Sequence, residues 1–220
     1  MTTPLDPHAG QSPLVDGVPL DHATYALVLV HGRGGTAEGM LPIARSAGAT
    51  DAALIAPRAA GGTWYPNRFR DAMASNEPYL TSALAAVQRT VEAVTAGGIP
   101  AERIILVGFS QGACLALEYA ARNARRLGGI AALAGALIGD EHDARHDAGT
   151  FANTPILLAC GDADDHIPEP RVRASATMLA AQGAVVDLRI YPGITHTIVA
   201  DQLDALRTMI DVVRGHALAG

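Results

Sequence analysis

The sequence predicts a three-layer α/β domain in which helices cover both faces of a mostly parallel sheet. The main observation is that short apolar runs of strand length alternate with longer stretches of helical periodicity. Such alternation is typical of βαβ units, whose parallel strands are buried on both faces and read as continuous apolar runs. A second observation is the length of 220 residues, which suits one domain of this kind. We expect this domain to span residues 23–220, behind an N-terminal extension of residues 1–22.

Each expected strand is a short apolar run that ends at glycine, proline or a polar loop. In chain order these strands are residues 25–30, 52–56, 103–107, 129–133, 155–160 and 184–190. The first expected helix follows Thr36, which can cap it, and has Glu38 in its first turn. The other expected helices are residues 78–96, 113–122, 171–182 and 197–216. Residues 1–22 are punctuated by proline and glycine, and we expect them to drape over the domain.

The junction at residues 108–112, with the sequence GFSQG, is the most informative part of the chain. It lies between an apolar strand and a helix, and G-x-S-x-G in that place is a nucleophile elbow, whose serine takes a strained backbone conformation. The glycines at 108 and 112 keep Cβ atoms out of the crowded turn. The helix N-terminus below the serine favours a developing oxyanion. We therefore interpret Ser110 as a nucleophile.

A nucleophilic serine needs a base, and the base needs an acid that orients it. In an open α/β sheet these groups come from loops at the carboxyl ends of the strands. The loop after the strand at 184–190 carries His196, which we interpret as the base. The loop after the strand at 155–160 carries three competing aspartates, at 162, 164 and 165. Asp162 can cap its own turn and Asp165 can cap the following helix. The chain order serine, aspartate, histidine is the order used in α/β-hydrolases.

Four segments of the chain carry motifs: HGRGG at 31–35, GFSQGA at 108–113, GDADDHIP at 161–168 and YPGITH at 191–196. Together they resemble the carboxylesterase/phospholipase family of small serine α/β-hydrolases, which includes acyl-protein thioesterase-like and dienelactone-hydrolase-like members. The resemblance implies a minimal α/β-hydrolase fold without a lid domain. It also selects Asp164 as the acid, because the family's acid precedes a short tail that ends in an aliphatic residue and proline, here Ile167 and Pro168.

The same resemblance implies further site residues. The family's oxyanion hole uses two backbone N–H groups, which fall on Arg33 and Gln111. Its tryptophan-containing loop is matched loosely by TWYP at 63–66, within the loop of residues 57–78, so that Trp64, Tyr65 and Phe69 are candidates for the substrate pocket. These aromatic residues can instead plug the edge of the domain. Dienelactone hydrolases place a cysteine at the nucleophile position, whereas the serine of this chain favours esters and thioesters.

These residues predict a serine hydrolase, without metal or cofactor, that cleaves small-molecule carboxylic esters through an acyl-enzyme intermediate. Thioesters and lactones are alternative substrates of the same triad. The lack of an inserted lid and the aromatic loop favour small or medium acyl or aryl esters over triglycerides. We expect activity to fall on acidification through roughly pH 6–7, because a protonated His196 cannot activate Ser110.

Composition excludes several other chemistries. All sixteen basic residues are arginine, which excludes Schiff-base, pyridoxal phosphate and P-loop lysine chemistry. A net charge of −6 argues against a nucleic-acid partner. No apolar run reaches the ~20 residues that membrane insertion needs. The first residues lack the order of a secretory signal, so we expect a cytoplasmic protein, either monomer or homodimer. We interpret Cys114 and Cys160 as small buried thiols, and His142 and His146 as solvated surface rather than metal ligands.

Two rival interpretations come from other functional classes. The sequence GRGGTA at 32–37 fits the G-x-G-x-x-A fingerprint of a dinucleotide-binding oxidoreductase. That fingerprint needs an acid after the second strand, where this chain has Pro57 and Arg58. The other rival is a catalytically inactive, hydrolase-like binding protein. Loss of activity typically breaks a triad, and all three positions are filled here.

Overall fold

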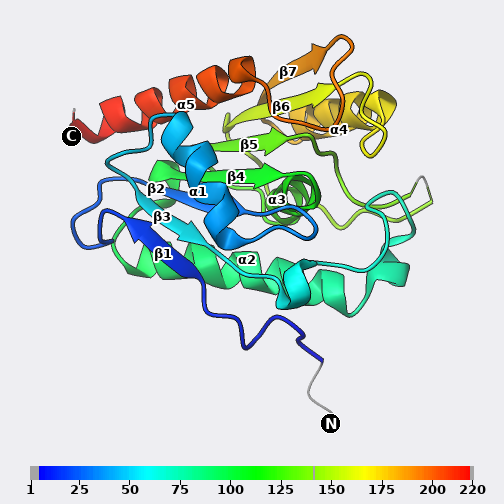
Figure 1. The fold of residues 1–220 in the computed structure, drawn as a ribbon, viewed down its shortest axis with the longest axis horizontal. Helices are drawn as coiled ribbons and strands as arrows, with labels where there is room; N and C mark the ends of the chain where they lie inside the picture. Colours follow the sequence, from blue (N-terminus) through cyan, green and yellow to red (C-terminus); the bar gives the residue numbers. More distant parts are fainter. Residues whose placement is uncertain (1–4, 141, 219–220) are drawn as a thin grey trace.

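The computed structural model describes residues 5–140 and 142–218. Within them lies a seven-stranded sheet with the strand order β1-β3-β2-β4-β5-β6-β7. All neighbouring strands are parallel except β1, which pairs antiparallel with β3. The mostly parallel sheet expected from the sequence is thus confirmed (Figure 1). The strands are β1 (Leu14–Gly17), β2 (Ala26–Val30), β3 (Ala53–Ala56), β4 (Ile104–Phe109), β5 (Gly129–Leu133), β6 (Pro155–Gly161) and β7 (Val185–Tyr191).

Helices cover both faces of the sheet and give the three layers of an α/β-hydrolase-like domain (Figure 1). On one face lie α1 (Ala37–Ser46) and α5 (Ala200–Leu218); on the other lie α2 (Tyr79–Ala96), α3 (Gln111–Arg122) and α4 (Glu169–Ala181). Side chains alternate along β2, so that Val28 packs in the core under α2–α4 and Leu29 in the core under α1 and α5. Since both faces are covered, every residue of β2 is buried.

The edge strand β1 was not expected, because residues 1–22 were predicted only to drape over the domain. Leu14 pairs with Ala56 and Gly17 with Ala53, which adds this segment to the sheet. Its four residues alternate between half-buried and exposed. Such a short, half-exposed strand gives too little hydrophobic periodicity to be recognised. The remaining strands agree with the sequence prediction to within two residues at each end.

The carboxyl ends of the parallel strands lie at one edge of the sheet, where three connections meet. They are the tight turn from β4 to α3 and the loops from β6 to α4 and from β7 to α5. The last loop is longer than predicted, because α5 begins at Ala200 rather than at residue 197. The segment between β3 and α2 adds two 3₁₀ turns, η1 (Ala60–Gly62) and η2 (Met73–Asn76). Among the described residues, no helix combines the length and hydrophobicity needed to span a bilayer.

Candidate active site

The turn between β4 and α3 holds Ser110 in a backbone conformation that few non-glycine residues adopt, with φ 56° and ψ −121°. Its neighbours explain how the chain folds there. A Cβ atom on Gly108 would lie 2.4 Å from the carbonyl oxygen of Gly112. A Cβ atom on Gly112 would lie 2.1 Å from the carbonyl oxygen of Val30. The turn therefore requires glycine at both positions, and it presents the serine at the edge of the sheet.

Three side chains from three different loops form a continuous chain of hydrogen bonds. The Oγ atom of Ser110 lies 2.7 Å from Nε2 of His196. Nδ1 of the same imidazole lies 2.7 Å from Oδ2 of Asp164. Ser110 lies 86 positions before His196 in the sequence, and Asp164 lies 32 positions before it. The three residues meet because β4, β6 and β7 end at the same edge of the sheet. The histidine side chain is 18% exposed, whereas the aspartate side chain is fully buried.

The surroundings of Asp164 keep its carboxylate ionised and fixed. Burial raises the pKa of this carboxyl group, but hydrogen bonds from His196 and from the backbone N–H groups of Ile167 and His166 outweigh burial, so the pKa lies below its ordinary value. Both N–H groups donate to Oδ1 at 2.9 Å. The thiol of Cys160 also donates to Oδ2, at 3.4 Å. This cysteine is buried, as the sequence predicted, but its contact with the acid could not be foreseen.

The other two aspartates of the same loop have different partners. Oδ1 of Asp162 accepts a hydrogen bond from the backbone N–H of Gly193 at 2.6 Å, which ties the β6–α4 loop to the β7–α5 loop. Asp165 is exposed, and its carboxylate lies 3.7 Å from Nε2 of His166. Of the three aspartates that competed on sequence grounds, only Asp164 contacts His196 within the described part of the chain.

Two backbone N–H groups near Ser110 have no acceptor among residues 5–140 and 142–218. Gln111 is the first residue of α3, so its N–H has no partner within the helix. In the other turn, the N–H groups of Gly34 and Gly35 donate to the carbonyl oxygens of Gly62 and Gly32, respectively. The N–H of Arg33, by contrast, has no acceptor in the described part of the chain. Both residues line the same cavity as the serine. This arrangement suits a developing oxyanion.

The side chains of the same two residues hold the loop that follows η1, a role the sequence did not reveal. The guanidinium of Arg33 donates to the carbonyl oxygens of Tyr65, Pro66 and Asn67 at 3.0, 2.9 and 2.6 Å. The side-chain amide of Gln111 accepts from the N–H of Trp64 and donates to the carbonyl oxygen of Tyr65. The position of this loop therefore depends on the residues that flank the serine.

The profile of the phospholipase/carboxylesterase family matches residues 18–214 of this sequence. The chain belongs to this family. In a solved structure, the phospholipase/carboxylesterase from Dyadobacter fermentans is 41% identical and superimposes with a TM-score of 0.88 over 96% of this chain and 98% of that one. The resemblance inferred from the four sequence motifs is confirmed.

Curated relatives of this phospholipase/carboxylesterase family member include acyl-protein thioesterases 1 of fungi. The protein of Gibberella zeae is 35% identical over 115 residues, which cover 51% of this chain and 49% of that one. The protein of Eremothecium gossypii is 30% identical over 202 residues, or 83% of this chain and 85% of that one. The match thus spans only about half the length of the first of these relatives.

In this family member, a cavity of about 880 Å³ opens beside Ser110 and His196. Of the three aromatic residues predicted for the pocket, Tyr65 and Phe69 line it. Trp64 does not; it lies fully buried beneath, and its indole N–H donates to the carbonyl oxygen of His31 at 2.8 Å. The cavity is also lined by Gly32, Arg33, Pro66, Asn67, Arg68, Arg70, Asp71, Phe109, Gln111, Cys114, Asp165, His166 and Ile167.

Two buried histidines flank Trp64 and fix the start of the pocket loop. The imidazole of His31 accepts from the N–H of Ala59 and contacts the carbonyl oxygen of Gly32. Burial lowers the pKa of this imidazole and so favours its neutral form. His8, from the N-terminal segment, accepts from the N–H of Ala60 and contacts the carbonyl oxygen of Trp64. Among the residues that the structure describes, no group of three or more His, Cys, Asp or Glu is placed to hold a metal ion.

Proposed function

We propose that this protein is a serine hydrolase that cleaves carboxylic esters or thioesters through an acyl-enzyme intermediate. Ser110 is the nucleophile, His196 the general base and Asp164 the acid that orients it. The observation that carries the proposal is the unbroken chain of two 2.7 Å contacts from the serine through the imidazole to a buried carboxylate. The named relatives and the solved structure described above support the same reaction class.

The geometry accounts for each proton in the reaction. The ionised carboxylate of Asp164 accepts a hydrogen bond from Nδ1–H of His196, so Nε2 carries the lone pair that accepts the proton of Ser110. As Oγ attacks the carbonyl carbon, Nε2 takes this proton, and the carboxylate stabilises the imidazolium. The imidazolium then protonates the departing alkoxide or thiolate. Water repeats the sequence on the acyl-enzyme, releases the acid and restores the serine.

The tetrahedral intermediates carry a negative oxygen that needs stabilising donors. The free backbone N–H groups of Arg33 and Gln111 are assigned this role, and each donor of this kind is worth roughly 3–4 kcal/mol in comparable sites. The dinucleotide alternative fits the same turn less well. Two of its backbone N–H groups, those of Gly34 and Gly35, already donate to carbonyl oxygens and are not available to a phosphate.

Labelling with a fluorophosphonate, read by intact mass, tests the proposal. The wild type is expected to take up one label, and Ser110→Ala none. Ser75→Ala, which removes an exposed hydroxyl from η2, serves as the control and is expected to label fully. A folded wild type that resists the probe refutes the proposal and favours the inactive binding protein. Binding of a nicotinamide cofactor, followed by fluorescence, decides the remaining alternative.

Matched substrates then rank the ester, thioester and lactone activities. An oxygen ester and a thioester of the same acyl chain differ only in the leaving atom, so the ratio of their kcat/KM values measures the preference directly. A series of acyl chain lengths measures how far the cavity beside Ser110 extends. Small and medium chains are expected to be preferred.

A further inference from the structure

The arginines of this protein fall into two groups. Nine of the sixteen form ion pairs with carboxylates: Arg45, Arg58, Arg89, Arg122, Arg145, Arg173, Arg189, Arg207 and Arg214. Within the described residues the other seven have no carboxylate partner. Three of these, Arg33, Arg68 and Arg70, line the cavity beside Ser110. A fourth, Arg171, lies over the ring of the cavity residue Phe69, 5.8 Å from its centroid.

Two of these four arginines are engaged by the backbone. Arg33 donates to three carbonyl oxygens of the pocket loop, and Arg171 to the carbonyl oxygens of Leu137 and Gly139. Carbonyl oxygens satisfy the N–H groups but leave the positive charge without a counter-charge. Arg33 thus shapes the cavity wall and leaves its positive charge at the cavity, and Arg171 places a second charge without a carboxylate partner behind the lining residue Phe69.

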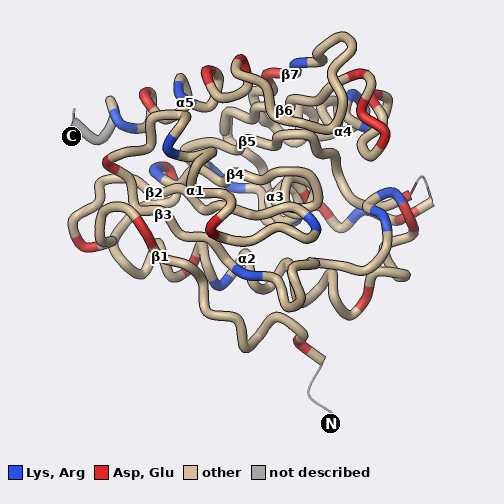
Figure 2. Tube along the Cα trace, viewed as in Figure 1, with Lys and Arg blue, Asp and Glu red and all other residues tan. Residues whose placement is uncertain are grey.

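Arg68 and Arg70 differ, because their guanidinium groups are exposed and make no hydrogen bond or ion pair with the described part of the chain. They lie on the segment that precedes η2, and this segment shows its basic positions in blue at the right of the view (Figure 2). Two carboxylates, of Asp71 and Asp165, share the cavity lining. Three arginines therefore face two acids there, in a protein whose net charge is −6.

A second, mostly apolar hollow lies next to the cavity. It has a volume of about 360 Å³ and shares Gly32, Arg33 and Phe109 with the cavity. Its further lining includes Met40, Ile43 and Ile198. A substrate that reaches both hollows thus meets apolar side chains in the smaller one and the free guanidinium groups of Arg68 and Arg70 in the larger one.

From this asymmetry, and resting on the hydrolase function proposed above, we infer that the substrate is an ester or thioester with one anionic group. Arg68 and Arg70 bind this group, a carboxylate or a phosphate, while the uncharged half occupies the apolar hollow. Guanidinium groups suit both anions, because their planar N–H donors match two oxygens at once. At these exposed positions each arginine is expected to contribute about 10-fold to kcat/KM, and less as salt screens the charge.

Three butyrate esters that differ only at the para position of the phenyl ring test the inference. They are 4-carboxyphenyl butyrate, its uncharged and nearly isosteric 4-carbamoylphenyl analogue, and 4-(phosphonooxy)phenyl butyrate. The measured quantity is the ratio of kcat/KM for an anionic ester to kcat/KM for the carbamoyl ester. Comparing this ratio between wild type and variants cancels the intrinsic difference in leaving-group reactivity.

Arg68→Gln and Arg70→Gln are each expected to lower the ratio about 10-fold at low salt, and added salt to lower the wild-type ratio. Asp71→Asn removes a competing carboxylate and is expected to raise the ratio, while its amide oxygen can still accept the backbone N–H of Arg68. The matched control is Arg103→Gln. Arg103 also lacks a carboxylate partner within the described residues, but it ends η3 (Ala101–Arg103) at the amino end of β4, and the ratio is expected to stay unchanged.

The anionic ester whose ratio falls further in Arg68→Gln and Arg70→Gln, the carboxylate or the phosphate, identifies the anion. Equal ratios in wild type, Arg68→Gln and Arg70→Gln, with the carbamoyl ester hydrolysed, overturn the inference and leave the hydrolase function intact. If no ester is hydrolysed and the fluorophosphonate does not label, the hydrolase function itself fails. Calorimetric binding of 4-hydroxybenzoate against 4-hydroxybenzamide then decides the arginine site without turnover, and equal affinities overturn it.

Discussion

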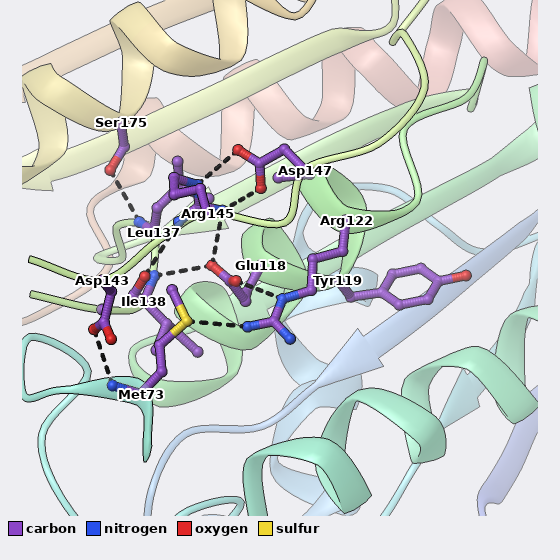
Figure 3. A network of polar contacts seen from close by, with 12 residues as sticks. Met73, Glu118, Tyr119, Arg122, Leu137, Ile138, Asp143, Arg145, Asp147 and Ser175 are labelled. Atoms are coloured by element: carbon purple, nitrogen blue, oxygen red, sulfur yellow. Dashed lines mark hydrogen bonds and ion pairs between the residues drawn. The ribbon is translucent and has the colours of Figure 1, made fainter. Parts of the chain in front are cut away.

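Replacing Glu118 by glutamine removes the negative charge at the centre of a buried polar network (Figure 3). This carboxylate, on α3, is 1% exposed and accepts hydrogen bonds from Arg122 at 2.7 Å, Arg145 at 3.1 Å and the N–H of Ile138 at 3.3 Å. Arg145 keeps a second acid in Asp147, at 2.6 Å. Within the described residues, Arg122 keeps only the sulfur of Met73, at 3.1 Å. The substitution therefore leaves one guanidinium without a counter-charge.

The expected loss of stability follows from burial. Removing one partner of a buried ion pair costs about 3–5 kcal/mol, and glutamine retains one acceptor oxygen, so we expect the lower end, about 3 kcal/mol. In a domain of this size 1 kcal/mol shifts Tm by about 2–4 °C, which gives roughly 6–12 °C. The chain offers a matched control in Glu169 and Arg173, an i,i+4 pair with the same 2.7 Å distance. Their side chains are 32% and 57% exposed, so Glu169→Gln is expected to cost about 0.5 kcal/mol.

Thermal unfolding followed by circular dichroism at pH 7 measures both variants, with urea unfolding as a second estimate of the free energy. The reasoning requires a clear difference between two chemically identical substitutions. If Glu118→Gln and Glu169→Gln lower Tm by the same amount, burial does not control the strength of these pairs in this protein, and the argument fails.

Three further changes test other parts of the site. Gly112→Ala places a Cβ atom 2.1 Å from a carbonyl oxygen of β2, and this variant is expected to lose fluorophosphonate labelling and to have a lower Tm. Its control is Gly215→Ala, whose new Cβ atom lies in open space on α5. The control is expected to keep the labelling and to have a slightly higher Tm. Because burial lowers the pKa of His31, the unfolded chain binds a proton more readily than the folded chain as the pH falls. The contribution of His31 to the free energy of unfolding is therefore complete above about pH 6.5 and decreases below it. Urea unfolding at pH 5–8 is expected to show a smaller decrease of this free energy in His31→Asn than in the wild type. Cys160→Ala removes a hydrogen-bond donor to Asp164, and Cys160→Ser supplies a stronger donor. The acidic limb of the pH–kcat/KM profile is therefore expected to move to higher pH in the alanine variant and to lower pH in the serine variant. Coincident limbs would show that the thiol contact has no influence.

Much of the fold and the core of the site could be predicted because their signals are local. The elbow shows this best, since the strand, the two glycines and the helix around Ser110 are contiguous in the sequence. The strands β2 and β4 are buried on both faces and therefore stand out as apolar runs. Topology points to His196 and to the loop that carries the acid, because loops after parallel strands must meet at one edge. It leaves three aspartates of that loop open, and the family resemblance selects Asp164 among them.

The parts that could not be predicted depend on contacts between distant segments. The strand β1 has only four residues, and it forms because the edge of β3 is available for pairing. His8 lies 56 residues before Trp64 and contacts its carbonyl oxygen through a ring nitrogen. No local sequence pattern indicates this long-range contact. Trp64 itself has the residue type expected of a pocket wall, but it is turned beneath the loop by its bond to His31.

Arg33 and Gln111 show why the shape of the pocket was the hardest part to foresee. For the oxyanion only their backbone N–H groups matter, so the motifs constrain their positions without revealing what their side chains do. In the fold, both side chains reach the segment at 64–67, between 32 and 47 residues away, and fix its carbonyl oxygens. The loop that presents the free arginines of the cavity is thus tied to the residues beside Ser110. A substitution of either side chain should therefore alter substrate preference even where the backbone donors are retained.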